Sequence, residues 1–328
     1  MKRLIAHISL ILFFTVLIFL FGIIFSTTQL DEKIITIEKG DNAMQIATTL
    51  QNEKIIKNKH FFYYYVLIFG NDKKLDFGSY LFDGKFSMFD VAKKIEDGKV
   101  KLRKITIPEG LTLKKTCRLL SKNDFGTYYD FITICNDSVF IQKITNFSHK
   151  NIEGFLFPET YHFPENVSEK FIISHLVKSF LRQTKNKKSN ENLNFYDTLI
   201  LASIVEKEAR LESEKPLIAS VYLNRLEDNH KLQADPTVAY ILENLGKTRK
   251  KIYYKDLEIK SPFNTYLNNG LPPTPICSPS LSSINAVINP QISDYYFFFA
   301  DGTGGHNFSK TYTEHSRKLQ LIRSQNGK

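Results

Sequence analysis

Hydrophobic residues are concentrated first at the N-terminus of the chain. From Leu4 to Phe25 there is no Asp, Glu, Lys or Arg. As a helix this run would be about 30 Å long, the thickness of a bilayer core. It ends in bulky residues, where a cleaved signal peptide needs small ones. Because Lys2 and Arg3 precede the run and two acidic residues follow it, the positive-inside rule predicts a cytoplasmic N-terminus and export of the rest. Residues 1–30 are therefore expected to form a cytoplasmic tail and an uncleaved transmembrane anchor.

After the anchor, one pattern of apolar positions recurs. Alternating isoleucines lead to a glycine in Ile35–Gly40 and again in Ile105–Gly110, and apolar residues at helical spacing follow each glycine. Residues 80–95 repeat the theme with one residue inserted. Such a pattern predicts a strand, a turn and a helix. The segment Lys59–Gly70 is too aromatic for a surface loop and is expected to form a further core helix. The first of these units have the size and order of a LysM-like glycan-binding module, which we assign to residues 31–122.

A long apolar helix is predicted over Asp197–Leu211, with Asp197 as its N-cap. At about 100° per residue, Glu208 falls among the apolar side chains. Glu206 falls on the polar side, four residues before Arg210, where the two can form an ion pair. Glu208 has no such explanation, and an unpaired carboxylate on an apolar face takes up a proton or costs several kcal/mol. A carboxyl that is neutral at neutral pH is what a general acid requires, so Glu208 is the candidate catalytic residue; membership of a structural ion pair is the alternative.

Two segments further along carry candidate polar groups. In Leu232–Thr237, Asp235 is expected to cap a helix that begins with a proline, and Gln233 just before it faces either solvent or a ligand. The aromatic run Tyr295–Phe299 predicts a strand buried on both faces. It leads to a glycine-rich segment that ends at His306. This segment fits either a ligand-binding loop or a plain hairpin turn.

Composition and charge narrow the possible partners. The chain has 328 residues, 42% of them hydrophobic, and a formal net charge of +10. This fits one or two globular domains and a partner that is nucleic acid, anionic lipid or an anionic polymer. Without the two basic residues of the tail, the exported part still carries +8, and export favours lipid or a cell-wall polymer over nucleic acid. The eight histidines form no His-Glu-x-x-His motif, which disfavours a zinc peptidase or amidase, and the three cysteines fit neither a zinc site nor a disulfide framework. We expect no metal and no cofactor.

Seven motifs occur in order along the rest of the chain. They are Ile152–Tyr161, Ala202–Glu208, Val221–Leu226, Leu232–Thr237, Asn264–Tyr266, Gly270–Pro273 and Ala300–His306. Behind an N-terminal anchor, this set resembles the YceG-like (MltG) endolytic murein transglycosylases. The chain departs from that family in having no tryptophan, which the family often carries near the first motif, where Phe155 and Phe157 stand instead. We can place no motif of that family in residues 123–150.

The resemblance implies a lytic transglycosylase, a lyase that cleaves the β-1,4 bond between N-acetylmuramic acid and N-acetylglucosamine in nascent glycan strands. The family's essential acid is the second glutamate of its Glu-Lys-Glu motif, which is Glu208 here. It would protonate the glycosidic oxygen and then take the proton of the muramyl O6 hydroxyl, which gives a 1,6-anhydro end and stops strand elongation. One carboxyl suffices, whereas an ordinary glycosidase needs two. From their membership of the motifs, the substrate-binding residues are expected to be Glu153, Gln233, Asn264, Tyr266 and His306.

The expected architecture is α+β: an anchor at residues 1–30, the LysM-like module at 31–122 and a larger α+β catalytic domain at 123–328. It implies a single-pass protein of the cytoplasmic (inner) membrane with its catalytic domain in the periplasm. The expected partners are peptidoglycan strands, the membrane and, by resemblance, a glycan-polymerising synthase, but no nucleic acid. Two other interpretations remain: a non-catalytic, membrane-anchored peptidoglycan-binding protein, and a basic nucleic-acid binder in the cytoplasm.

Overall fold

The structure, a computed structural model, describes most of the chain. The described residues are 26–69, 75–98, 102–146, 150–164, 167–187, 189–247 and 251–326, together with five isolated positions before residue 26. The predicted anchor at Leu4–Phe25 therefore lies, apart from those five positions, outside the described residues. Over the described part of the chain, no helix combines the length and the apolar character needed to cross a membrane.

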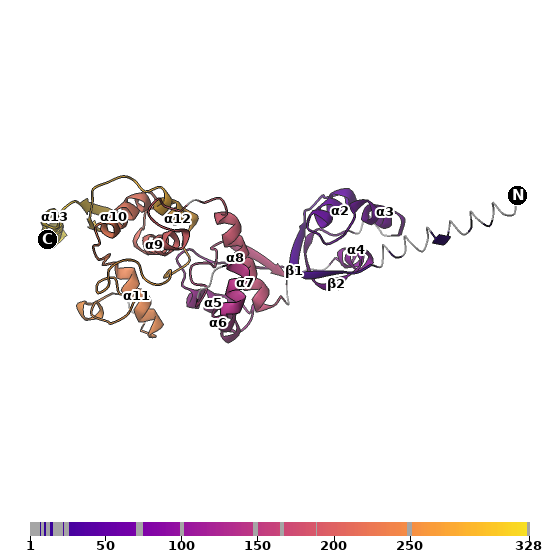
Figure 1. Ribbon diagram of the computed structural model, residues 1–328, viewed down its shortest axis with the longest axis horizontal. Coiled ribbons are helices and arrows are strands. Elements are labelled where there is room, and N and C mark those ends of the chain that lie inside the picture. Colours follow the sequence, from indigo (N-terminus) through magenta and orange to yellow (C-terminus); the bar gives the residue numbers. More distant parts are fainter. Residues whose placement is uncertain are drawn as a thin grey trace. The chain divides into compact units, whose positions relative to one another are not determined.

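The chain divides into two compact units, which Figure 1 colours from indigo to yellow along the sequence. Unit 1 comprises Met1–Lys104 and His162–Val167, and unit 2 comprises Ile105–Tyr161 and Ser168–Lys328. The division falls near residue 104, whereas the sequence pattern grouped residues 105–122 with the first module. The reason is that α5 (Leu113–Lys122), the helix of that stretch, packs against α6 (Tyr128–Cys135) of unit 2.

Unit 1 is built on an antiparallel pair of strands, β1 (Thr28–Ile37) and β2 (Gly78–Phe86). Its helices are α2 (Ala43–Asn52), α3 (Lys59–Phe69) and α4 (Met88–Glu96). The side chains of Asn42 and Ser87 cap α2 and α4, and each takes part in a capping box. All five elements contribute apolar side chains to one core. The predicted helix in the aromatic segment is confirmed.

Unit 2 is mainly helical. Besides α5 and α6, its elements are α7 (Ser138–Thr145), α8 (Glu169–Thr184), α9 (Phe195–Glu208), η2 (Glu212–Glu214), α10 (Lys215–Glu227), α11 (Asp235–Asn244), η3 (Tyr254–Asp256), α12 (Leu281–Ile288), β5 (Phe297–Ala300), β6 (His306–Ser309) and α13 (Tyr312–Asn326). Two more strands, β3 (Leu102–Thr106) and β4 (Thr160–Pro164), pair with each other and cross the division between the units. The predicted mixture of helices and strands is therefore confirmed. Within the stretch that matches no motif, α6 and α7 pack against α8.

The helix that carries Glu208 forms the centre of unit 2. α9 contacts α10, α11 and α12 (Figure 1), and every side chain from Thr198 to Val205 is buried. The sequence predicted one apolar and one polar side. This is wrong over Thr198–Val205, where neighbouring elements cover α9 all round, whereas Lys207 in the last turn is exposed as expected. Ser203, expected on the polar side, is fully buried, and its hydroxyl accepts a hydrogen bond from the backbone N–H of Ile276 (3.0 Å).

The aromatic run near the C-terminus forms a shorter strand than expected. β5 begins at Phe297, and Phe297–Phe299 are half-buried rather than buried on both faces, because β5 and β6 make a sheet of two strands. The glycine-rich segment between them is a hairpin turn. In it the N–H of Asp301 donates to the carbonyl of Gly305 (2.9 Å), and Oδ1 of Asp301 accepts from the N–H of Thr303 (2.7 Å). His306 follows the turn as the first residue of β6.

Candidate active site

Glu208 is the last residue of α9. The helix begins after Asn194, whose side chain accepts a hydrogen bond from the N–H of Asp197 (2.9 Å), so Asn194 and not Asp197 is the N-cap. The helix ends at Glu208 because Ala209 takes an extended backbone conformation. Leu211, expected on the buried side, is 45% exposed. Glu208 therefore lies at the end of a buried helix rather than in the middle of an apolar stripe.

A cavity of about 330 Å³ opens at Glu208. It is lined by Glu208, Tyr222, Arg225, Gln233, Asp235, Tyr266, Phe298, Phe299, Ala300 and His306. These residues come from α9, α10, α11, the β5–β6 hairpin and the loops before α11 and after η3. The cavity thus brings together four residues that the sequence analysis singled out: Glu208, Gln233, Tyr266 and His306. A concave site with converging polar groups is typical of a small-ligand or active site.

Burial controls the protonation of Glu208. It raises the pKa of this carboxyl to about 7, while the hydrogen bond from Tyr222 lowers the pKa, the charge of Asp235 raises it and Arg225 lowers it. The Tyr222 hydroxyl donates to Oε1 of Glu208 at 2.8 Å. At neutral pH roughly half of the molecules therefore carry a proton on Glu208. Such a group can both give and accept a proton during a reaction.

Gln233 lines the cavity in a strained backbone conformation. Its φ of +48° is in the left-handed region, which costs a residue other than glycine about 1–3 kcal/mol. Its N–H donates to the carbonyl of Thr265 (3.1 Å), and the N–H of Ala234 donates to the Thr265 hydroxyl (3.0 Å). These bonds hold Gln233 against the loop that carries Tyr266. Strain that neighbours maintain in this way is typical of functional sites.

Tyr266 and Asp235 form a polar pair in the lining of the cavity. The Tyr266 hydroxyl donates to Oδ1 of Asp235 at 2.6 Å. Burial raises the pKa of Tyr266, and the hydrogen bond to Asp235 acts in the same direction, so the phenol stays a donor. The expected capping role of Asp235 is wrong: Ala234 is the N-cap of α11 and no side chain caps that helix end. The carboxylate of Asp235 is bound to Tyr266 instead.

His306 is fixed by a single glutamate. One oxygen of Glu214 accepts the backbone N–H of His306 (2.9 Å), and the other lies 2.7 Å from the ring Nδ1. Since a carboxylate only accepts hydrogen bonds, Nδ1 is the donor. The ring also packs edge-on against Phe298, with the ring centroids 5.4 Å apart. Nε2 is therefore the ring nitrogen that His306 offers to a ligand in the cavity.

Comparison with known proteins shows the family to which this chain belongs. A family model described as the YceG-like family matches residues 35–321. The chain belongs to the YceG-like family. A relative from Bacillus subtilis (strain 168), named endolytic murein transglycosylase, is 33% identical over 313 residues, which cover 90% of this chain and 86% of the relative. A protein of the same name from Streptococcus pneumoniae serotype 2 (strain D39) is 29% identical over 314 residues, and the match covers 86% of this chain and 57% of that longer protein.

The fold has a relative among solved structures. A 2.6 Å crystal structure of a yceG-like protein from Listeria monocytogenes matches with a TM-score of 0.59 and 34% sequence identity. The match covers 88% of this chain and 98% of the Listeria chain. The YceG-like architecture therefore extends over both units.

Two predicted substrate-binding residues are not among the described residues that line the cavity. Asn264 is fully buried; its amide donates to the carbonyls of Leu257 and Ile259, and its Oδ1 accepts the N–H of Tyr266 (3.0 Å). Glu153 is buried and accepts from the N–H of Leu113 (2.8 Å) and the hydroxyl of Tyr240 (3.1 Å). Burial raises the pKa of Glu153 to about 8. Asn264 shapes the loop that carries Tyr266, and Glu153 joins the start of α5 to α11.

Sequence reasoning did not single out Tyr222 and Arg225, which line the cavity from α10. Both belong to the YceG-like motif Val221–Leu226, and their spacing of three residues places them on the same face of a helix. Arg225 donates from Nε to the carbonyl of Tyr296 (2.7 Å) and from a terminal nitrogen to that of Leu232 (2.5 Å). It thus ties the β5 hairpin and the loop before α11 to α10. The helical spacing of the motif was the signal that could have found them.

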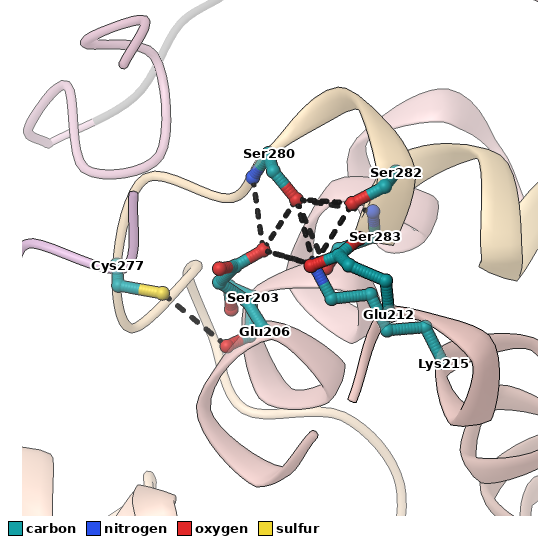
Figure 2. A network of polar contacts seen from close by, with 8 residues as sticks. All are labelled: Ser203, Glu206, Glu212, Lys215, Cys277, Ser280, Ser282 and Ser283. Atoms are coloured by element: carbon teal, nitrogen blue, oxygen red, sulfur yellow. Dashed lines mark hydrogen bonds and ion pairs between the residues drawn. The ribbon is translucent and has the colours of Figure 1, made fainter. Parts of the chain in front are cut away.

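Glu206 belongs to a different, structural cluster, which Figure 2 shows. Its Oε2 accepts from the hydroxyls of Ser280 and Ser283 (both 2.6 Å) and lies 3.4 Å from Nζ of Lys215. The Lys215 side chain is only 3% exposed and also donates to Ser282 (2.8 Å). The expected ion pair is therefore wrong, since Glu206 pairs with Lys215 instead of the residue four positions on, where α9 has already ended. This cluster fastens α9 to the starts of α10 and α12.

Proposed function

We propose that this chain is an endolytic murein transglycosylase and that Glu208 is its general acid. Three relatives carry that name. The observation that supports the assignment of Glu208 most directly is chemical: this carboxyl has a pKa of about 7, lines a polar cavity and has one oxygen held by Tyr222. A group with these properties is protonated often enough at neutral pH to donate a proton to a leaving oxygen.

In the proposed reaction, Glu208 gives up one proton and takes up another. Glu208 gives its proton to the glycosidic oxygen as the bond from that oxygen to muramyl C1 breaks. The resulting carboxylate takes the proton of the muramyl O6 hydroxyl as O6 bonds to C1. The products are a 1,6-anhydro-muramyl end and a glucosaminyl 4-hydroxyl, no water is consumed, and Glu208 ends protonated as it began. Because Tyr222 occupies Oε1, Oε2 is the oxygen that transfers the proton.

The remaining polar groups of the cavity are proposed to bind the sugars. Gln233, Tyr266 and His306 supply amide, hydroxyl and imidazole groups that suit acetamido and hydroxyl substituents. For His306 the contact would be through Nε2, because Glu214 occupies Nδ1. Asn264 would act by holding the backbone of Tyr266 in place. Glu153 would act still more remotely, by joining the start of α5 to α11.

Asp235 favours a second candidate, a hydrolase. Glycosidases that hydrolyse their substrates use two carboxylates, and Asp235 lines the same cavity as Glu208. Oδ1 of Asp235 already accepts the Tyr266 hydroxyl at 2.6 Å, which argues against Asp235 as the base that activates water. The transglycosylase therefore remains the preferred candidate.

Digestion of purified peptidoglycan in ¹⁸O-labelled water separates the candidates. For a transglycosylase we expect mass spectrometry to find new 1,6-anhydro ends without ¹⁸O. New reducing ends labelled with ¹⁸O, in excess of those in a sample incubated without the enzyme, would identify a hydrolase. Binding without any new ends would identify a non-catalytic peptidoglycan-binding protein.

The location of the enzyme is part of the same proposal. The apolar run Leu4–Phe25 would anchor the chain in the cytoplasmic membrane, with both units on the periplasmic side, next to nascent strands and a glycan-polymerising synthase. The order β-α-α-β of the first four elements of unit 1 supports a LysM-like, glycan-binding role. Alkaline phosphatase, which folds only outside the cytoplasm, can be fused after Lys328. We expect the fusion to be active, and an inactive but intact fusion would reject export.

A further inference from the structure

Helix α3 of unit 1 carries an aromatic or aliphatic residue at every position from Phe61 to Phe69, yet much of its surface is uncovered. Phe62 and Val66 are fully buried in the core of the unit, and Tyr63 and Tyr65 pack partly against that core. A helix with apolar residues on every side is normally buried on every side, in a large core or in a membrane. The uncovered side of α3 therefore needs an explanation.

The uncovered side carries four large apolar or aromatic residues. Their exposed fractions are 36% for Phe61, 58% for Tyr64, 45% for Leu67 and 68% for Ile68. At about 3.6 residues per turn, positions 61, 64, 67 and 68 lie on one side of the helix, opposite Phe62 and Val66. We call these four residues the α3 face. A contiguous apolar face of this kind marks a site of interaction, since single exposed residues are ordinary but a helical row of them is not.

The α3 face begins next to the point where the chain would leave the bilayer. Phe61 lines the same small hollow as Ser26 and Thr28. Ser26 directly follows the apolar run Leu4–Phe25, so in an anchored protein it stands at the membrane surface. In an anchored protein the N-terminal end of α3 would therefore lie at the membrane surface too.

The charges at this end of α3 suit the same location. Lys57 lines the hollow together with Phe61, and Lys59 is the first residue of the helix. Lysine beside aromatic and aliphatic residues is the composition of helices that lie in the plane of a membrane interface, where tyrosine and phenylalanine sit at the level of the head groups. Lysine ammonium groups there are attracted to anionic lipid phosphates.

We propose that the α3 face lies in the interfacial layer of the bilayer, so that unit 1 touches the membrane through α3 as well as through the anchor. The partner is the lipid surface on the side to which the chain is exported. This inference rests on the anchoring part of the proposed function. Contact through α3 would fix how unit 1 is oriented on the membrane, which a single flexible connection from the anchor would not.

The chain contains no tryptophan, so Tyr64→Trp creates a single fluorescent reporter on the α3 face. Tyr64 is exposed, so the substitution should leave the circular dichroism and the unfolding temperature unchanged. The full chain is reconstituted into vesicles of phosphatidylcholine with about one-fifth phosphatidylglycerol, with or without brominated acyl chains. The control is Tyr129→Trp, which places the reporter on α6 of unit 2 at a side chain that is 76% exposed.

We expect blue-shifted emission from Tyr64→Trp and a loss of roughly half of it in brominated vesicles, because interfacial helices insert about 5–10 Å. Emission from Tyr129→Trp should stay red-shifted and unquenched. Unquenched, red-shifted emission from Tyr64→Trp would overturn the proposal. Blue-shifted emission that brominated lipid does not quench, and that shifts back to the red when the protein is diluted, would also overturn it, since a second copy of the chain would then cover α3. Flotation of the vesicles tests the anchor separately. Protein that fails to float rejects anchor and α3 contact together, whereas protein that floats unquenched rejects the α3 contact alone.

Discussion

Glu208→Gln should make the protein more stable above neutral pH although it removes the proposed acid. The ordinary pKa of a glutamate is 4.5, and burial raises the pKa of Glu208 to about 7. Between these values the unfolded chain releases its proton before the folded chain does, so stability falls as the pH rises and the loss is complete above about pH 7. At about 1.36 kcal/mol for each pH unit, this interval amounts to about 3 kcal/mol.

Glutamine stays neutral in both states and keeps an oxygen that can accept the Tyr222 hydroxyl. Glu208→Gln should therefore recover up to about 3 kcal/mol at about pH 8 and almost nothing at about pH 4. For a unit of this size, that gain corresponds to a rise of roughly 6–12 °C in Tm. Thermal unfolding followed by circular dichroism at the two pH values measures it.

The matched control is Glu227→Gln on α10, where the glutamate is exposed. This change should alter Tm little at either pH. A Glu208→Gln protein no more stable than the wild type at about pH 8 would refute the reasoning, since Glu208 would then lose little solvation when the chain folds.

Tyr222→Phe removes a hydrogen bond that lowers the pKa of Glu208, so the alkaline limb of the pH–rate profile should move up by about one pH unit. If the alkaline limb of the profile stays where it is, Tyr222 does not influence the pKa of the catalytic acid. Lys215→Met leaves a buried carboxylate without its cation and should cost about 3 kcal/mol in thermal unfolding, whereas Lys310→Met, in an exposed pair, should change little. Equal effects of these two variants would count against a buried cluster. Asp235→Asn should still yield 1,6-anhydro ends by mass spectrometry, and complete loss of cleavage would favour the hydrolase.

The sequence identified Glu208 for a reason that the structure partly changes. The helical wheel placed the carboxyl among apolar residues, and Glu208 is indeed desolvated. The desolvation arises at the end of α9 and not in the middle of an apolar stripe, because the helix stops at Glu208. Local pattern was enough to select the residue, because the helical spacing places Glu208 one turn after Ile204, which is fully buried. The start of the helix was predicted wrongly because two residues that can both act as N-cap, Asn194 and Asp197, lie three positions apart, and the structure uses Asn194.

Contacts between distant segments could not be read from local pattern. Glu206 looked like a surface residue because its partners, Ser280 and Ser283, are more than seventy positions away. Asp235 looked like a cap because the proline beside it is typical of a helix start, whereas Tyr266, about thirty positions on, takes its carboxylate. Both errors concern polar side chains, whose partners are chosen by the tertiary fold and not by spacing along one helix.

The central claim is that Glu208 is the acid that cleaves the glycan strand. It is tested most directly by counting the 1,6-anhydro strand ends that each variant produces. Folded wild-type protein, Glu208→Gln and the control Glu227→Gln are incubated in equal amounts with purified peptidoglycan, and 1,6-anhydro ends are counted by mass spectrometry. We expect the wild type and Glu227→Gln to give equal numbers of anhydro ends and Glu208→Gln to give at least about 100-fold fewer, the usual contribution of a general acid. Anhydro ends from Glu208→Gln at the wild-type level would contradict the assignment of Glu208 as the acid.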